Sequence, residues 1–283
     1  MTAGRFTALA VTAALMTAGC GHPDAHHPAE LVVGSRAGIE STLLADVYTG
    51  ALRSYGFPAH TEQAPDPLSK LDSGAFVVVP SLTGRVLQIF QPGANARSDA
   101  QVYKAMIGAL PEGIAAGDYA TAAEDKPALA VAAHTSNDWR GHDLGVLAKH
   151  CDGLTVGSVA GASTPTSIGG CRLPASHEFP NETTLYAAVR SGEVTAAWTS
   201  TADPNVPADL VVLTDGKPAL VQAENVVPLY RRNELNDRQL LAVNEVAGVL
   251  DTAALVDMRR QVTAGADPQA VADAWLTEHP LGR

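Results

Sequence analysis

Polar side chains stand directly after several candidate strands of this sequence. The turns in question are Gly34-Ser35-Arg36, residues 81–85, residues 162–167, residues 198–201 and Glu224-Asn225. Open α/β sheets bind their ligands at such strand ends, and arginine and glutamate side chains there form strong charge-assisted hydrogen bonds. Together the turns outline a cleft suited to a small polar molecule.

Motifs of the common catalytic sites are absent from the sequence. It contains no Gly-x-Ser-x-Gly elbow, no Walker loop, no Gly-x-Gly-x-x-Gly and no His-Glu-x-x-His. His142 and His150 stand eight residues apart beside an expected helix, too far apart to ligate one metal ion from the same turn. We therefore expect a binding protein rather than an enzyme, with no catalytic residue, no metal site and no cofactor.

The N-terminus has the composition of a secretory signal. Arg5 precedes an apolar run and then small residues that lead into Cys20, and the run is too short to span a bilayer. The stretch LMTAGC resembles the lipobox of bacterial lipoproteins, except that Thr17 stands where leucine is usual. We expect residues 1–19 to be removed and Cys20 to carry a lipid that anchors the protein at the outer face of the cell membrane. An ordinary signal peptide with a chance cysteine is the alternative.

Residues 20–29 are polar and contain proline, as in a tether between the lipid and the folded body. Without residues 1–19 the chain retains 30 acidic and 18 basic residues, a net charge of −12, because only Arg5 is lost. This charge disfavours nucleic acid as a partner. In an oxidising compartment Cys151 and Cys171 are expected to form a disulfide; two free thiols are the alternative.

Apolar runs and helical periodicities alternate through the chain, which predicts an α/β protein. The candidate strands are LVVGSR, FPAHTEQ, GAFVVVPSL, PALAVAAH, LTVGSVA, VTAAWTS, LVVLTD and NVVPLYR, and we expect mainly parallel, buried sheets. Helices are expected from Gly38 to Tyr55 and through the last fifty residues, where Asp251 and Asp267 provide N-caps and Gly265 a stop.

The order of several segments resembles the solute-binding proteins of ABC importers for glycine betaine, choline and carnitine. The segments are GSRAGIESTLLADVYTGALRSYGF, PSLTGRVLQ, LPEGI followed by ALAV, TTLYAAVRSGEVTAAW, DLVVLTD and NVVPLYRRNEL. The composition, rich in alanine and poor in lysine, is similar to that of mycobacterial lipoproteins of this kind. The resemblance implies a two-lobe periplasmic-binding-protein-like (type 2) fold with an interlobe ligand cleft and two chain crossings. It places residues 30–130 plus 225–283 in lobe 1 and residues 131–224 in lobe 2.

The resemblance also shows where this chain departs from the family. The family holds a trimethylammonium group in a box of aromatic rings, but Leu82, Pro127 and Glu224 occupy three positions that match the rings, which leaves Trp198 as the expected wall. Arg85 replaces the last threonine of the family's Tyr-Thr-Gly-Thr segment, and the arginine of lobe 2 has no counterpart in residues 162–167. The expected ligand-binding residues are Ser35, Arg36, Leu82, Thr83, Arg85, Trp198, Glu224 and Asn225.

These observations predict a lipid-anchored solute receptor that acts as a monomer and delivers a small-molecule solute to an ABC permease and ATPase complex. The altered aromatic box points to a polar or zwitterionic ligand different from the family's quaternary amines. The alternative is an envelope or adapter protein that kept the binding fold without transport.

Overall fold

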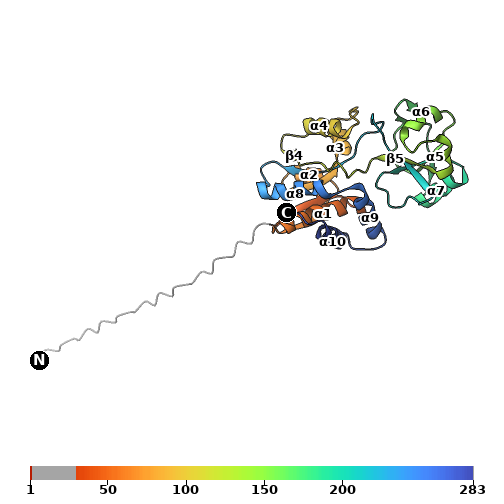
Figure 1. The fold of residues 1–283 in the computed structure, drawn as a ribbon. Helices are drawn as coiled ribbons and strands as arrows, with labels where there is room; N and C mark the ends of the chain where they lie inside the picture. Colours follow the sequence, from red (N-terminus) through yellow and green to blue (C-terminus); the bar gives the residue numbers. More distant parts are fainter. Residues whose placement is uncertain (2–29, 283) are drawn as a thin grey trace.

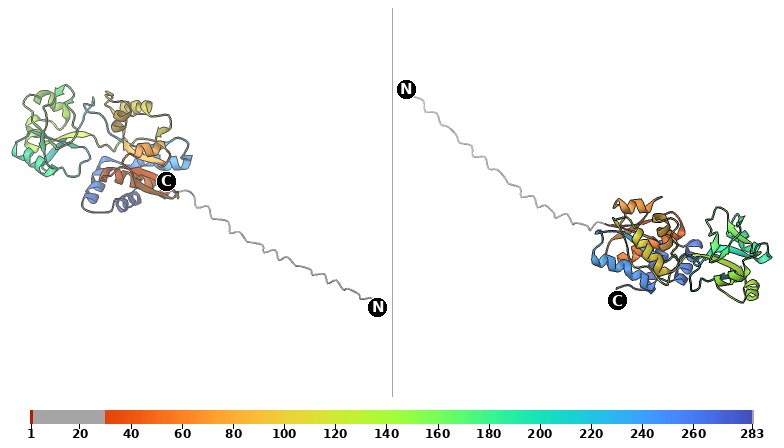
Figure 2. Two further views of the ribbon diagram at one scale, coloured as in Figure 1. Left: turned by 180° about the vertical axis from the view of Figure 1, so that it is seen from behind. Right: turned by 90° about the horizontal axis from the view of Figure 1, so that it is seen from above.

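Two α/β lobes lie side by side and are joined by thin connections (Figures 1 and 2). The computed structural model describes residue 1 and residues 30–282, so the expected signal, the tether and Cys20 lie outside the described residues. A helix-rich lobe contains both the beginning and the end of this segment, and a smaller lobe contains its middle (Figure 1). The chain therefore crosses between the lobes twice, and the α/β fold class and its two-lobe form are confirmed.

Lobe 1 is built on a five-stranded sheet with the order β2-β1-β3-β12-β4. Its strands are β1 (Leu31–Ser35), β2 (Ala59–Gln63), β3 (Val78–Leu82), β4 (Ile114–Ala116) and β12 (Val226–Arg231). The helices of this lobe are α1 (Ile39–Ser54), α2 (Pro67–Asp72), α3 (Thr83–Phe90), α4 (Asp99–Ala109), α8 (Asp237–Val249), α9 (Thr252–Thr263) and α10 (Pro268–Glu278). Helix α1 is buried along most of its length, because α8, α9 and α10 of the C-terminal segment pack around it.

Lobe 2 has its own five-stranded sheet with the order β11-β5-β10-β6-β9. These strands are β5 (Pro127–Ala132), β6 (Val156–Val159), β9 (His177–Phe179), β10 (Ala196–Ser200) and β11 (Leu210–Leu213), and a small hairpin pairs β7 (Ser167–Ile168) with β8 (Cys171–Arg172). The helices are α5 (Ala133–Trp139), the 3-10 turn Leu144–Val146, α6 (Leu147–His150) and α7 (Glu182–Ser191). A disulfide between Cys151 and Cys171 links the hairpin to the end of α6 and confirms the expected pairing.

Both sheets are mixed, so the expectation of mainly parallel sheets is wrong. Strand β12 runs antiparallel to β3 and β4, and β5 runs antiparallel to β10 and β11. Each of these two strands directly follows a crossing. A strand that enters a sheet from the other lobe runs opposite to its neighbours, which the pattern of apolar runs does not reveal.

The two crossings run beside each other as a short ladder. Asp125 donates its backbone N–H to the carbonyl of Glu224 over 2.9 Å, and Ala120 donates to Val226 over 2.8 Å. The first crossing leads into β5, so residues 127–130 already belong to the second sheet. The paired backbone fixes the position of Glu224 between the lobes.

Helix starts follow the capping rules that the sequence indicated. Asp251 accepts a hydrogen bond from Ala254 N at 2.8 Å, Asp267 accepts one from Ala270 N at 2.9 Å, and Asn181 caps α7 through Thr184 N at 2.9 Å. Within residues 30–282, no single helix has the length and apolar character needed to cross a membrane; the pair α8 and α9, bent by 96°, passes such a test only when joined.

Candidate solute-binding cleft

A cavity of about 520 Å³ lies between the lobes, within the range of small-molecule sites. Lobe 1 contributes Glu40, Arg85 and Arg259 to its wall, and lobe 2 contributes Glu182, Trp198 and Asp203. Asp125 and Glu224 enter from the two crossings, and Pro127 is the first residue of β5. Because both lobes and both crossings contribute to the wall, the cavity exists only when both lobes are folded and joined.

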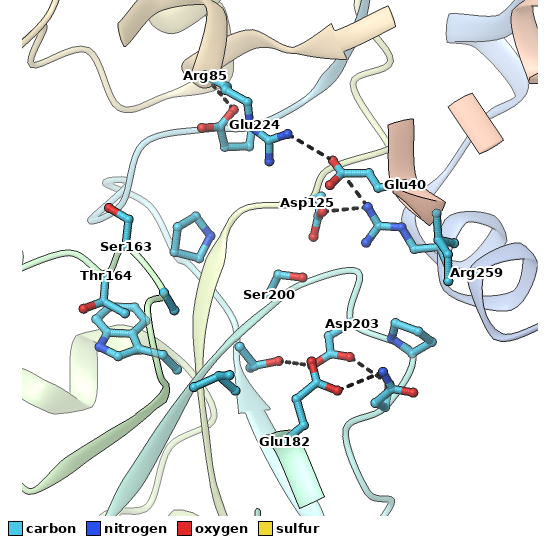
Figure 3. A pocket seen from close by; sticks show the side chains of 18 of the residues that line it. Glu40, Arg85, Asp125, Ser163, Thr164, Glu182, Ser200, Asp203, Glu224 and Arg259 are labelled. Atoms are coloured by element: carbon cyan, nitrogen blue, oxygen red, sulfur yellow. Dashed lines mark hydrogen bonds and ion pairs between the residues drawn. The ribbon is translucent and has the colours of Figure 1, made fainter. Parts of the chain in front are cut away.

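The carboxylate of Glu224 faces the start of α3. It accepts the backbone N–H of Arg85 over 2.8 Å (Figure 3), and the Thr83 hydroxyl holds the same turn by accepting the N–H of Asn225 over 3.1 Å. A Cβ at Gly84 would lie 2.8 Å from Glu224 Oε1, so only glycine permits this approach. Burial raises the pKa of Glu224 to about 7, against the opposing effects of the Arg85 N–H and guanidinium.

Arg259 of α9 is the centre of a charged network on the lobe 1 side (Figure 3). Its guanidinium lies 2.7 Å from Asp125 Oδ2 and 3.4 Å from Glu40 Oε1, and it donates to the carbonyl of Ala202, in lobe 2, over 2.9 Å. Burial raises the pKa of Glu40. Burial would also raise the pKa of Asp125, but Arg259, together with hydrogen bonds from Ser200 and Ala202, lowers it below its ordinary value. Both arginines of the cavity wall are engaged here, since Arg85 also reaches Glu40 at 3.7 Å.

On the lobe 2 side, two carboxylates line the wall side by side (Figure 3). Asp203 accepts hydrogen bonds from Tyr186 at 2.5 Å and Thr199 at 2.7 Å, and Glu182 accepts one from Asn205 at 2.9 Å. Burial and the neighbouring Asp203 raise the pKa of Glu182. The hydrogen-bond donors to both carboxylates are neutral groups.

Trp198 provides the aromatic surface of the cavity. It lies on β10, is only 7% exposed and packs in the lobe 2 core while also lining the cavity. Pro127, one of the positions where the family has a ring, lies on the same wall. The cleft therefore combines a single aromatic side chain with several charged groups.

Three of the eight residues expected to bind ligand, Arg85, Trp198 and Glu224, line this cavity. The other five lie elsewhere. Ser35 is fully buried, Arg36 is exposed outside the cavity wall, and Leu82 packs in the lobe 1 core. Thr83 is buried, and its hydroxyl accepts the backbone N–H of Asn225, the residue after Glu224. The Asn225 side chain donates to the carbonyl of Ala120 at 3.1 Å, and Asn225 lines a second cavity.

Sequence reasoning missed five charged residues of the wall: Glu40, Asp125, Glu182, Asp203 and Arg259. Glu182 directly follows Asn181, the N-cap of α7, and Glu40 lies in the first turn of α1, just after Gly34-Ser35-Arg36. Both therefore lie next to features that the sequence indicated. Arg259 stands in the middle of a C-terminal helix and Asp125 lies 134 residues before it, and nothing in the spacing connects them.

The second cavity, of about 680 Å³, lies along the crossings and is lined by Arg97, Glu124, Lys126 and Asp215 among others. Lys126 Nζ lies 3.0 Å from Glu124 and 3.6 Å from Asp215, so these three charges of the cavity are paired with one another. Within residues 30–282 no group of three His, Cys, Asp or Glu side chains is placed to hold a metal ion.

Comparison with known proteins identifies relatives of the whole folded body. Residues 29–278 match the family described as the substrate binding domain of ABC-type glycine betaine transport systems. Among solved structures, apo YehZ from Escherichia coli aligns with a TM-score of 0.70 at 18% identity, covering 89% of this chain and 99% of that one. A glycine betaine/carnitine/choline ABC transporter structure aligns with a TM-score of 0.73 at 15% identity, covering 88% and 97%. Comparison with curated sequences gives no match.

Proposed function

Since the chain belongs to the OpuAC family of substrate-binding domains of ABC-type glycine betaine transport systems, we propose that it binds a small polar or zwitterionic solute other than the family's quaternary amines. A substrate-binding protein of this class is a receptor and not an enzyme. The observation that supports the proposal is the interlobe cavity lined by charged side chains from both lobes. A ligand that contacts both walls favours the closed arrangement of the lobes, which an ABC permease can distinguish from the open one.

The composition of the cavity wall supports a change of ligand. A trimethylammonium group is held by ring faces, each worth about 2 kcal/mol when desolvated. Among the described residues that line the cavity, Trp198 is the one aromatic side chain. Pro127 and Glu224 stand in the wall where the family resemblance implies rings. Weakened cation-π binding and added charge both favour a solute that makes hydrogen bonds and ion pairs.

Thermal stabilisation against betaines, carnitine, amino acids, amines, polyols and sugars tests the receptor function. A solute present at a hundred times its dissociation constant adds about 2.7 kcal/mol to the free energy of unfolding. The shift is expected to be lost in Trp198→Ala and retained in part in Trp198→Phe, which keeps a ring in the core. A betaine or choline shift that exceeds all others and disappears in Trp198→Ala would contradict the changed ligand.

We further propose that Cys20 carries a lipid that anchors the mature chain at the outer face of the cell membrane, where it works as a monomer with a permease and ATPase complex. The supporting observation is the sequence LMTAGC after an apolar segment. Metabolic labelling with a fatty-acid precursor is expected to mark the wild-type protein and not Cys20→Ala. Label that persists in the variant would exclude this anchor.

A second candidate is an envelope or adapter protein that kept the fold without transport, and the reduced aromatic box favours it. This function predicts no ligand-dependent stabilisation by any solute of the set. It also predicts that a cleft variant leaves association with its protein partner unchanged.

A further inference from the structure

The charges of the interlobe cavity do not balance. Its wall contains five carboxylates, Glu40, Asp125, Glu182, Asp203 and Glu224, and two guanidinium groups, those of Arg85 and Arg259. Both arginines point at acids of the protein, with Arg259 between Asp125 and Glu40. The wall thus has more negative than positive charges. Neither of its two guanidinium groups pairs with the acids of lobe 2.

The surplus is greatest on the lobe 2 wall. Asn205 joins Glu182 and Asp203 by donating its amide to the first at 2.9 Å and its backbone N–H to the second at 2.8 Å. Within residues 30–282, no arginine, lysine or histidine lies within ion-pair distance of either carboxylate. Burial is the larger cause of the raised pKa of Glu182, and repulsion from Asp203 is the second. A cation bound between the two carboxylates would relieve this repulsion.

An anionic ligand group is disfavoured at the same place. The start of α7, which would otherwise attract an anion, is capped by the Asn181 side chain and carries Glu182 in its first turn. The backbone N–H of Thr184 there is already bonded to the Asn181 side chain at 2.9 Å.

A buried acceptor in the wall adds an independent indication. The Asp125 side chain is only 8% exposed. Its Oδ2 pairs with Arg259, and its Oδ1 lacks a well-formed hydrogen bond within residues 30–282, although Ser200 and the backbone of Ala202 lie close enough to lower the pKa of this carboxyl. An unsatisfied buried carboxylate oxygen is costly. Figure 3 shows Asp125 beside Arg259 and Ser200, on the side of the cavity across from the pair Glu182–Asp203, so a donor on a ligand in the cavity can approach this carboxylate from that side.

We propose that the cleft is selective for a small organic cation that bears N–H donors, a primary or secondary ammonium or a guanidinium group, held by Glu182 and Asp203 of lobe 2 and reaching Asp125 from the other side. This inference rests on the proposed receptor function and specifies its substrate class. A quaternary ammonium has the charge but no N–H, so it forms none of the charge-assisted hydrogen bonds that these carboxylates accept. A neutral polyol has donors but leaves the surplus charge uncompensated.

Isothermal titration of the purified protein at pH 8 tests the inference with a matched pair of probes. Ethanolamine and choline share a skeleton and differ in whether N–H or N-methyl groups surround the nitrogen; 1,4-diaminobutane and glycine betaine extend the comparison. We expect 1,4-diaminobutane to bind one to one and ethanolamine to bind at least tenfold more tightly than choline. Glu182→Gln is expected to weaken both amines tenfold or more, and the exposed-acid control Glu193→Gln to leave them unchanged.

Circular dichroism checks that Glu182→Gln is folded, and Asp203→Asn, expected to weaken both amines as well, is the second variant. Choline binding as tightly as ethanolamine, or amine binding that Glu182→Gln leaves intact, would overturn the inference. Stabilisation by a neutral or anionic solute alone would overturn it while leaving the receptor function in place. Absence of binding by every solute of the wider set would contradict the receptor function as well.

Discussion

Replacing Glu224 by glutamine removes a buried carboxylate whose ionised form is destabilised by the loss of solvent. Burial raises its pKa from 4.5 to about 7, and Arg85 and Asp125 are the charged groups that act on it. The folded state therefore holds a proton on Glu224 between pH 4.5 and 7 where the unfolded chain has released it. The free energy of unfolding falls as the pH rises through this window, because the folded state binds more protons there.

The magnitude follows from the two pKa values. A tenfold change in an equilibrium constant is worth about 1.36 kcal/mol, so the full penalty is roughly 3.4 kcal/mol, of which about 2.5 kcal/mol develops between pH 5 and pH 8. Glutamine cannot ionise, yet its oxygen can still accept the N–H of Arg85. Glu224→Gln should therefore gain stability relative to wild type by about 2.5 kcal/mol more at pH 8 than at pH 5.

Urea unfolding followed by circular dichroism at pH 5, 6, 7 and 8, with the disulfide intact, measures this difference. The exposed Glu193→Gln is the control and should show no such trend. A stability difference between Glu224→Gln and wild type that stays constant with pH would refute the raised pKa. One that shrinks as the pH rises would mean that Arg85 outweighs burial.

Three further predictions concern the framework of the cleft. Arg259→Leu should lower the free energy of unfolding by about 3 to 5 kcal/mol, because it leaves the buried Asp125 without its cation; adding Asp125→Asn should restore part of the loss in a double-mutant cycle, and strict additivity would contradict the pairing. Reduction of the Cys151–Cys171 disulfide, which closes a loop of about 20 residues, should cost roughly 3 kcal/mol, and an unchanged melting temperature under reducing conditions would argue against it. Gly84→Ala should cost about 1 to 3 kcal/mol because its Cβ meets a backbone oxygen; calorimetry that finds it neutral would show that the turn can shift.

Local signals in the sequence predicted most of the elements. The strand that contains Leu82 and the strand that follows Glu224 lie where the apolar runs indicated, and Asp251 and Asp267 cap their helices as expected. Such features depend on neighbours within a few residues, so a single sequence contains the information. The short strands β4, β7, β8 and β9 have only two or three residues each and left no periodicity to recognise.

The composition of the cleft could be predicted only in part. Arg85, Trp198 and Glu224 lie in segments that match family motifs, whereas Arg259 reaches the cavity because α9 packs against the crossings, far along the chain from Asp125. Ser35 and Leu82 stand at strand ends as expected, but both side chains are buried in lobe 1. Which way a strand-end residue faces depends on sheet register and on the packing of the other lobe, and neither is encoded in the turn itself.

Direct measurement of solute binding tests the central claim that the interlobe cleft is a receptor site. Titration of the purified protein with the full set of solutes is expected to give one-to-one binding by at least one of them, with the affinity reduced tenfold or more in Glu182→Gln and unchanged in Glu193→Gln. No heat of binding from any solute, or binding that every cleft variant leaves intact, would contradict the claim.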